Sequence, residues 1–185
     1  MKRSIFNMSL CFFLMLSLFL IETQPAYAKT DIPAGDVSGT WTQSNSPYNI
    51  NGEITIPNGE TLTIKPGVDV IFTGHYKFYV KGRLLALGTK QDMIIFTAKA
   101  EGWHGIKLVN ISSSNDSTIF EYCKFQFGKA NTGSGHLNRC GGAIFTKVNK
   151  LRISHCLFQF NMTYSTSRHE SAGGAICIGG GRPGN

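Results

Sequence analysis

The sequence predicts an all-β chain whose short strands repeat along a solenoid, a coil in which successive turns stack on one another. The segment Thr118–Phe127 resembles Leu151–Phe160 at an offset of 33 residues, and Gly141–Ile144 is identical to Gly173–Ile176 at an offset of 32. Within each copy, inward apolar residues alternate with other side chains, as in a strand with one buried face. No stretch after residue 28 has the period of a helix.

The composition is that of one folded domain or one array of repeats. The chain has 185 residues, of which 42% are hydrophobic and 16% are charged, and this balance excludes an intrinsically disordered chain. The 21 glycines follow no Gly-X-Y period, which excludes collagen.

The first 28 residues have the pattern of a signal peptide. A short basic N-terminus precedes the apolar run Leu10–Ile21, and Ala26–Ala28 then has the small-x-small pattern of a cleavage site. A membrane-spanning helix needs about 20 apolar residues, but Glu22 ends this run early and no later stretch is long enough. We therefore expect a secreted or cell-surface protein with no transmembrane span after cleavage.

The mature chain is expected to contain an N-terminal linker and cap at residues 29–51 and repeats at residues 52–185. Coil starts are expected near Ile54, Lys77, Gly105, Gly142 and Gly174, which gives about 4–5 coils. Because Gly173–Ile178 begins a further coil shortly before the sequence stops, we expect the last coil to be incomplete and the repeats to be truncated at the C-terminus. Further coils of a longer chain are thus expected as partners. An alternative interpretation is that the chain is a truncated piece without an independent function.

The repeat also predicts a corner and an interior. The alternation slips at Glu121–Tyr122 and again at Ser154–His155, which indicates a bend between two short strands. The phenylalanines are expected to form an interior stack, namely Phe72, Phe96, Phe120, Phe125, Phe127, Phe158 and Phe160.

The two Gly-Gly-Ala-Ile boxes, the Phe158–Asn161 box and the Leu-x-Ile-x-x-Cys-x-Phe run resemble secreted right-handed parallel β-helix repeat proteins, which share the pectate-lyase-like solenoid. They are also similar to repeats of polymorphic outer-membrane proteins and bacterial surface adhesins. The resemblance covers about residues 52–185 and implies a right-handed, single-stranded parallel β-helix. The first copy departs from the pattern, because Gly128 stands where the second copy has Asn161.

The cysteines are expected to be buried rather than reactive. Cys123 and Cys156 occupy matched inward positions, where a stack of small hydrophobic side chains is favoured over a disulfide or a metal site. A pairing of Cys140 with Cys177 is left open. No Cys-x-x-Cys motif, phosphate loop or dinucleotide fingerprint occurs, so neither a metal nor a cofactor is expected.

The resemblance raises polysaccharide cleavage as an activity. A lyase of this fold would need clustered carboxylates for calcium, and a hydrolase would need two acids that flank the scissile bond. No two Asp or Glu residues after residue 28 stand two positions apart. We therefore expect no enzymatic activity, and the alternative is an accessory or remnant part of a polysaccharide lyase or glycoside hydrolase.

Basic and aromatic residues supply the candidate binding surface. Loss of Lys2, Arg3 and Glu22 with the leader lowers the formal net charge from +7 to +6, a scattered excess with no block typical of a nucleic-acid-binding protein. The candidate contacts for a polysaccharide or a cell-surface protein are Lys77, Lys81, Arg83, Lys147, Lys150, Arg152 and Trp103. An ordinary solvated surface is the competing interpretation. The expected function is that of an exported, non-catalytic, adhesin-like scaffold.

Overall fold

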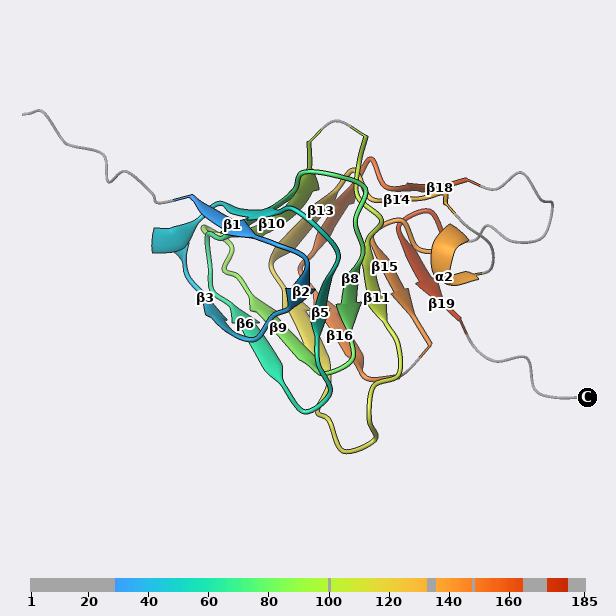
Figure 1. Ribbon diagram of the computed structural model, residues 1–185, viewed down its shortest axis with the longest axis horizontal. Helices are drawn as coiled ribbons and strands as arrows, with labels where there is room; N and C mark the ends of the chain where they lie inside the picture. Colours follow the sequence, from blue (N-terminus) through green and yellow to red (C-terminus); the bar gives the residue numbers. More distant parts are fainter. Residues whose placement is uncertain (1–28, 100, 133–135, 148, 165–172, 180–185) are drawn as a thin grey trace, which may run out of the picture.

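The computed structural model describes residues 29–99, 101–132, 136–147, 149–164 and 173–179. The signal peptide predicted at residues 1–28 and the end of the last coil lie outside the described residues. The described chain is all-β and its strands pair in parallel, which confirms the predicted class and is consistent with a β-helix-like solenoid (Figure 1). One short helix, α2 (His136–Arg139), and a 3-10 turn, η2 (Gln43–Asn45), accompany the strands.

Three parallel sheets enclose one core. Sheet A contains, in spatial order, β1 (Thr30–Ile32), β4 (Tyr48–Ile50), β7 (Asp69–Phe72), β10 (Ile94–Ala98), β13 (Cys123–Gln126) and β17 (Leu157–Gln159). Sheet B contains β2 (Gly35–Asp36), β5 (Ile54–Ile56), β8 (Phe78–Val80), β11 (Ile106–Leu108), β15 (Ile144–Thr146) and β19 (Ile176–Ile178). Sheet C contains β3 (Gly39–Trp41), β6 (Thr61–Ile64), β9 (Arg83–Leu87), β12 (Thr118–Glu121) and β16 (Leu151–Ser154). β14 (Lys129–Ala130) pairs with β18 (Met162–Thr163) outside these sheets.

The chain visits sheets A, B and C in turn, and we call each such pass a round. Sheets A and B hold six strands each, one round more than the upper limit expected from the sequence. The additional round comes from residues 29–51, the expected linker and cap, because β1, β2 and β3 in this region are the first strands of the three sheets.

The strand registers confirm the internal repeat. Phe125 pairs with Phe158 and Thr118 pairs with Leu151, both at the offset of 33. Ile144 pairs with Ile176, at the offset of 32. Equivalent side chains of neighbouring rounds therefore lie about one strand spacing apart, roughly 4.8 Å.

Paired inward residues form continuous files through the core. One file in sheet A ascends through aliphatic and aromatic residues that are buried up to Phe125 and half-buried at Phe158, namely Tyr48, Val70, Phe96, Phe125 and Phe158. The rings of Phe96 and Phe125 stack at 5.0 Å, and those of Phe125 and Phe158 stack at 4.9 Å. Such burial of aromatic surface along the whole stack is the main source of stability for rounds that cannot fold alone.

The expected bend is present as a single left-handed residue in each of the last two rounds. Tyr122 has φ 48° and His155 has φ 54°, and their rings stack at 4.6 Å on the outside of the corner. The prediction that the phenylalanines form an interior stack is wrong for Phe127 and Phe160, which are exposed. Phe127 and Phe160 also have positive φ, which turns both rings away from the core, where they stack on each other at 5.4 Å.

The departure of Gly128 from the repeat has a steric cause. The Asn161 side chain accepts a hydrogen bond from the Gly128 N–H at 2.9 Å and donates one to the Phe125 carbonyl at 2.9 Å. A Cβ at residue 128 would lie 2.3 Å from the Gly142 carbonyl oxygen and 2.8 Å from the Asn161 side-chain oxygen. Only glycine fits beneath Asn161, so an asparagine ladder cannot run through both rounds.

Candidate functional site

Five of the predicted contact residues lie along the corner between sheets B and C. Lys81 and Arg83 stand where β8 leads into β9, and the other three, Lys147, Lys150 and Arg152, lie where β15 leads into β16 two rounds further along. The corner of the round between them is the longer loop 109–117. The structure thus gathers residues that are up to about 70 positions apart in the sequence on one side of the stack.

Two of these cations hold the 109–117 loop in place. Arg83 forms an ion pair with Asp116 at 3.2 Å and donates a hydrogen bond to the Ser117 carbonyl at 3.2 Å. Lys150 donates to the carbonyls of Ser113 and Asn115. Their charged groups are therefore engaged within the protein.

The remaining cations of this corner are exposed. Lys81, Lys147 and Arg152 all have exposed side chains, and we call these three residues the basic corner. Lys77 lies away from it, at the entry to β8, where its half-buried amine pairs with Glu53 at 3.4 Å. Of the predicted cations, all of which lie within the described residues, the basic corner contains those that are exposed on this side of the stack.

Trp103 was predicted as a surface contact, and this prediction is wrong. The indole is fully buried, stacks on Phe72 at 4.3 Å and donates a hydrogen bond to the Gln126 carbonyl at 2.8 Å. Gly102 and Gly105 on either side have φ of 89° and 82°, so the backbone turns sharply and inserts the ring between rounds. A glycine-flanked tryptophan gave no indication in the sequence of which way it would point.

Two histidines meet at the corner between sheets A and B. The His104 ring lies 4.9 Å from the His75 ring, and the His75 Nε2 contacts the Lys129 carbonyl at 2.6 Å. His104 is buried, and neither of its ring nitrogens has a hydrogen-bond partner within the described residues. Burial, with nearby Lys107 and Lys77, lowers the pKa of His104 to about 3, so the ring is neutral at physiological pH.

A second, smaller core lies on the outer face of sheet B. The segment that contains α2 covers Phe145 and Cys177 there, and Cys140, Val109 and Leu137 complete the cluster (Figure 1). We call this cluster the satellite core. Its presence was not predicted, because alternation in β11 and β15 places these outward side chains on a surface that would ordinarily meet water.

Lys107 is fully buried at the edge of the satellite core. Its amine donates hydrogen bonds to the carbonyls of Cys140 at 3.2 Å and Gly141 at 3.1 Å, and it lies 5.8 Å from the centre of the Phe145 ring. Burial, with a further contribution from Lys77, lowers the pKa of Lys107 to about 7. Alternation along β11 places Lys107 on the outward face of sheet B, but nothing in the sequence showed that a loop covers the side chain.

The cysteines form two pairs of neighbours. Cys123 and Cys156 interact across β13 and the start of the next round, and their thiols also lie within reach of the Ala86 and Phe120 carbonyls. Cys177 interacts through its thiol with Cys140 inside the satellite core. Cys123, Cys156 and Cys177 are free thiols.

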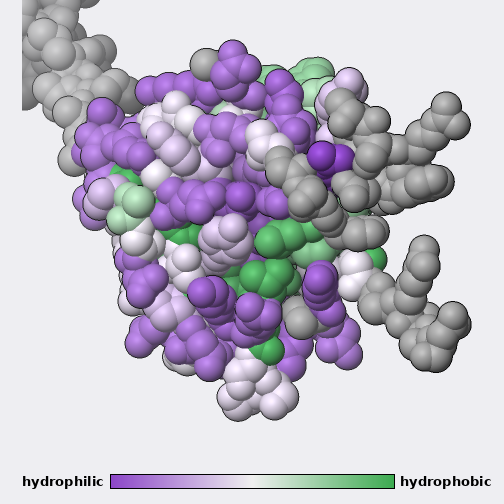
Figure 2. Space-filling view, turned by 45° about the vertical axis from the view of Figure 1, so that its right-hand side comes forward, coloured by the Kyte–Doolittle hydropathy of each residue, from purple (hydrophilic) through white to green (hydrophobic). Residues whose placement is uncertain are grey.

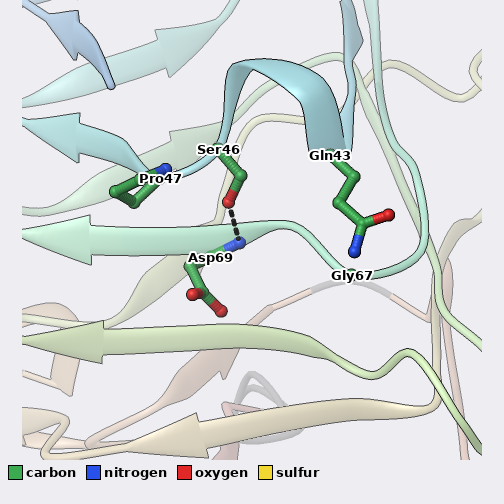
Figure 3. A pocket seen from close by; sticks show the side chains of 5 residues that line it. All are labelled: Gln43, Ser46, Pro47, Gly67 and Asp69. Atoms are coloured by element: carbon green, nitrogen blue, oxygen red, sulfur yellow. Dashed lines mark hydrogen bonds between the residues drawn. The ribbon is translucent and has the colours of Figure 1, made fainter. Parts of the chain in front are cut away.

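A cavity of about 240 Å³ that is open to solvent lies at the first rounds and is lined by Gln43, Ser46, Pro47, Gly67 and Asp69 (Figure 3). The Ser46 hydroxyl accepts a hydrogen bond from the Asp69 N–H at 2.9 Å. Burial raises the pKa of the Asp69 carboxyl. Asp69 is the one carboxyl among these lining residues, so this cavity does not supply the pair of acids that glycoside hydrolysis requires.

The described residues contain no group of three or more His, Cys, Asp or Glu side chains that could hold a metal ion. Within the same residues, no helix is both long and apolar enough to cross a membrane.

Comparison with known proteins identifies no relative of this chain. No protein-family model matches the sequence, and no curated protein and no solved structure matches it either. The resemblance to β-helix repeat proteins therefore rests on the sequence boxes and on the parallel sheets.

Proposed function

We propose that the chain is an exported, non-catalytic scaffold with the architecture of a right-handed parallel β-helix, and that it binds an acidic polysaccharide through the basic corner. The observation that carries this proposal is the exposure of Lys81, Lys147 and Arg152 on one side of the stack. The leader-like pattern of residues 1–28 supports export.

The spacing of the rounds suits a ligand with repeated charges. Lys81 belongs to the third round, whereas Lys147 and Arg152 belong to the fifth, so the strands that carry them are separated by two strand spacings, or roughly 10 Å. An extended polyanion presents negative charges at intervals along its length and can contact cations from both rounds at once. Because these cations are exposed, the attraction is expected to be modest and sensitive to salt.

The composition of the two cavities favours a binding role over hydrolysis, because Asp69 is the one carboxyl among the residues that line the first cavity. A further cavity, of about 350 Å³, is lined by Val109, Asn110, Ile111, Leu137 and Lys147 and has no carboxyl among these residues. Neither cavity thus has the paired acids of a glycoside hydrolase.

Calorimetric titration with polygalacturonate at low and physiological salt tests the proposal. We expect Lys147→Glu combined with Arg152→Glu to weaken binding about tenfold or more, because two attractive contacts become repulsive. The matched control is Lys65→Glu combined with Lys90→Glu, which changes the net charge equally at exposed sites away from the basic corner.

An equal loss of affinity in both double variants, or no binding by the unmodified protein, would contradict the proposal. Release of reducing sugars that is abolished by Asp69→Asn would favour the enzymatic alternative instead.

A further inference from the structure

The satellite core brings together two cysteines from different rounds. Cys140 directly follows α2 and enters the cluster from the covering segment, whereas Cys177 lies on β19 in the last round. Both are buried, and the thiol of Cys177 hydrogen-bonds to Cys140. The two side chains therefore lie next to each other in the satellite core before any bond joins them.

The main chain holds the two residues in this arrangement. The Gly141 N–H donates to the Gly173 carbonyl at 3.0 Å, and a Cβ on Gly141 would lie 3.1 Å from the Cys177 nitrogen. The positive φ of Gly141, 61°, turns the chain directly after Cys140. The backbones of the two segments are thus packed closely enough for a bond between side chains to form without a large rearrangement.

Cys140 and Cys177 differ geometrically from the other neighbouring pair. Cys177 is in register with Phe145 on the adjacent strand, not with Cys140, so Cys140 reaches it from the overlying segment. Cys123 and Cys156, in contrast, occupy equivalent positions one residue before the paired Lys124 and Leu157. Side chains at equivalent positions on parallel strands point in the same direction, which is unfavourable for the dihedral angle that a disulfide requires.

We propose that Cys140 and Cys177 form a disulfide bond by exchange with a small-molecule or protein disulfide, and that this bond fastens the last round to the segment that covers sheet B. One thiol loses its proton and attacks a sulfur of the co-reactant, which gives a mixed disulfide and releases one thiolate. The second cysteine then attacks the protein sulfur and expels the other thiolate. One S–S bond is consumed and one is formed, and the two cysteine protons pass to the two released thiols.

Exchange is expected to begin at Cys177, which lies on the edge strand and is the more exposed of the two residues. Burial raises the pKa of Cys177 to about 11, but the nearby Lys107 amine acts in the opposite direction. Because the thiolate is the attacking species, Lys107 accelerates the reaction without entering it. It is a positioning residue in this step.

The experiment incubates the reduced protein with oxidised glutathione, alkylates the remaining thiols and identifies linked peptides by mass spectrometry. We expect one linked pair, Cys140 with Cys177, and two alkylated cysteines, Cys123 and Cys156. The Cys123→Ser, Cys156→Ser double variant is the matched control and should form the same link. The Cys140→Ser variant should stop at a glutathione adduct on Cys177, and Lys107→Met should slow the reaction several-fold while giving the same product.

Peptide mapping of the unmodified protein does not depend on whether any variant folds. A Cys123–Cys156 link, a mixture of pairings, or four thiols that all remain open to alkylation after denaturation would overturn the proposal. The expected consequence is a higher melting temperature for the oxidised protein, and this difference should disappear in Cys140→Ser.

Discussion

The first and last rounds differ in how they close the interior of the stack. At the first round, three inward files end on small residues, namely Thr30, Gly35 and Gly39, and Trp41 of the same round stacks on Tyr48 of the next round at 4.6 Å. At the last round the files end on large apolar residues that stay half-buried, namely Phe158, Ile176 and Leu151. Within the described residues, the interior is thus more deeply buried near the first round than at the last, and we call these two rounds the closed end and the open end.

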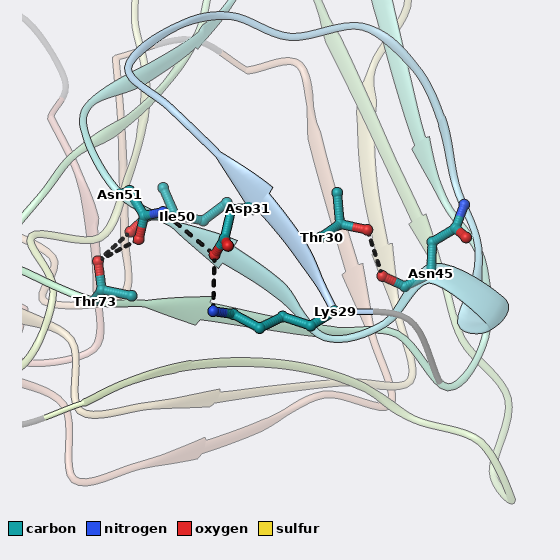
Figure 4. A network of polar contacts seen from close by, with 7 residues as sticks. All are labelled: Lys29, Thr30, Asp31, Asn45, Ile50, Asn51 and Thr73. Atoms are coloured by element: carbon teal, nitrogen blue, oxygen red, sulfur yellow. Dashed lines mark hydrogen bonds and ion pairs between the residues drawn. The ribbon is translucent and has the colours of Figure 1, made fainter. Parts of the chain in front are cut away.

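Polar contacts reinforce the first round. Thr30 donates a hydrogen bond to the Asn45 carbonyl at 2.8 Å, Lys29 pairs with Asp31, and Asn51 bonds both Asp31 and Thr73 (Figure 4). These contacts join the edge strand to the two rounds that follow. They fix the position of β1, which within the described residues pairs with a strand on one side and has no strand on the other.

The last round instead exposes large hydrophobic side chains. Phe160 and Ile178 are 72% and 75% exposed, and Leu157, Met162 and Tyr164 are exposed as well. Figure 2, which brings this end forward, shows hydrophobic residues gathered near the middle of the face. Among the described residues, the comparison teaches that a repeating round leaves large apolar residues half-buried, whereas residues that break the repeat, such as Gly35 and Gly39, end the files at the first round.

The largest expected effect is a difference in the loss of stability between two substitutions in the same inward file of sheet A, one near the first round and one at the last. Tyr48→Ala is expected to destabilise the protein by about 3–5 kcal/mol, because the ring is buried against Trp41, whereas Phe158→Ala at the open end should cost about 1–2 kcal/mol. Urea unfolding of both variants measures the difference. Equal losses would show that the open end is as well packed as the closed one.

A smaller effect concerns the middle of the stack and pH. The pKa of His104 is about 3 in the folded protein, below its ordinary 6.5, so the unfolded chain binds a proton that the folded one does not. The contribution of His104 to the free energy of unfolding is therefore fully present above about pH 6.5. It falls by about 1.4 kcal/mol for each pH unit as the pH decreases from about 6.5 towards 3. Urea unfolding at pH 7 and pH 4 should show this loss.

The variant His104→Leu should lose less stability than the unmodified protein between pH 7 and pH 4. Its unfolded state no longer gains a proton at residue 104 that the folded state cannot bind. His155→Gln, at an exposed position in the last round, is the matched control and should retain the acid-dependent loss. If His104→Leu keeps the full loss, carboxyl groups rather than this histidine determine the acid sensitivity.

The smallest effect on folding is expected at the exposed end. Ile178→Lys combined with Leu157→Lys should change the free energy of unfolding by about 0.5 kcal/mol or less for each substitution. The same variant should self-associate less, because lysines on edge strands oppose pairing with another chain. Light scattering over a concentration series measures this, and Thr40→Lys at the first round is the control. An unmodified protein that stays monomeric throughout would contradict it.

Features that recur along the chain could be predicted from the sequence. The β class, the offsets of 33 and 32, and the bends at Tyr122 and His155 all follow from comparing one copy with another, and the registers and backbone angles confirm them. The first round escaped prediction because its residues include Gly35 and Gly39, which carry no apolar alternation.

The candidate sites were less predictable because they depend on contacts that occur once. Lys107 is buried by the α2 segment, and Arg83 and Lys150 are engaged by the 109–117 loop, although all three residues alternate as surface residues do. Non-repeating segments that fold over a repeating surface leave no periodic signal in the sequence. Lys147 and Arg152, in contrast, are exposed, as a surface contact requires, because no segment within the described residues covers them.

The corner between sheets C and A has a consequence for where the chain tolerates change. In the last two rounds this corner consists of one residue, Tyr122 or His155, whereas the other two corners accommodate long segments such as 128–143 and 109–117. One residue added at Tyr122 would turn every following side chain of β13 to the opposite face, which would place Lys124 in the core. In the last two rounds, new sequence, whether acquired naturally or grafted to display a peptide, is therefore accommodated at the other two corners and excluded from this one. In earlier rounds the same corner does hold longer segments, 42–47 and 88–93.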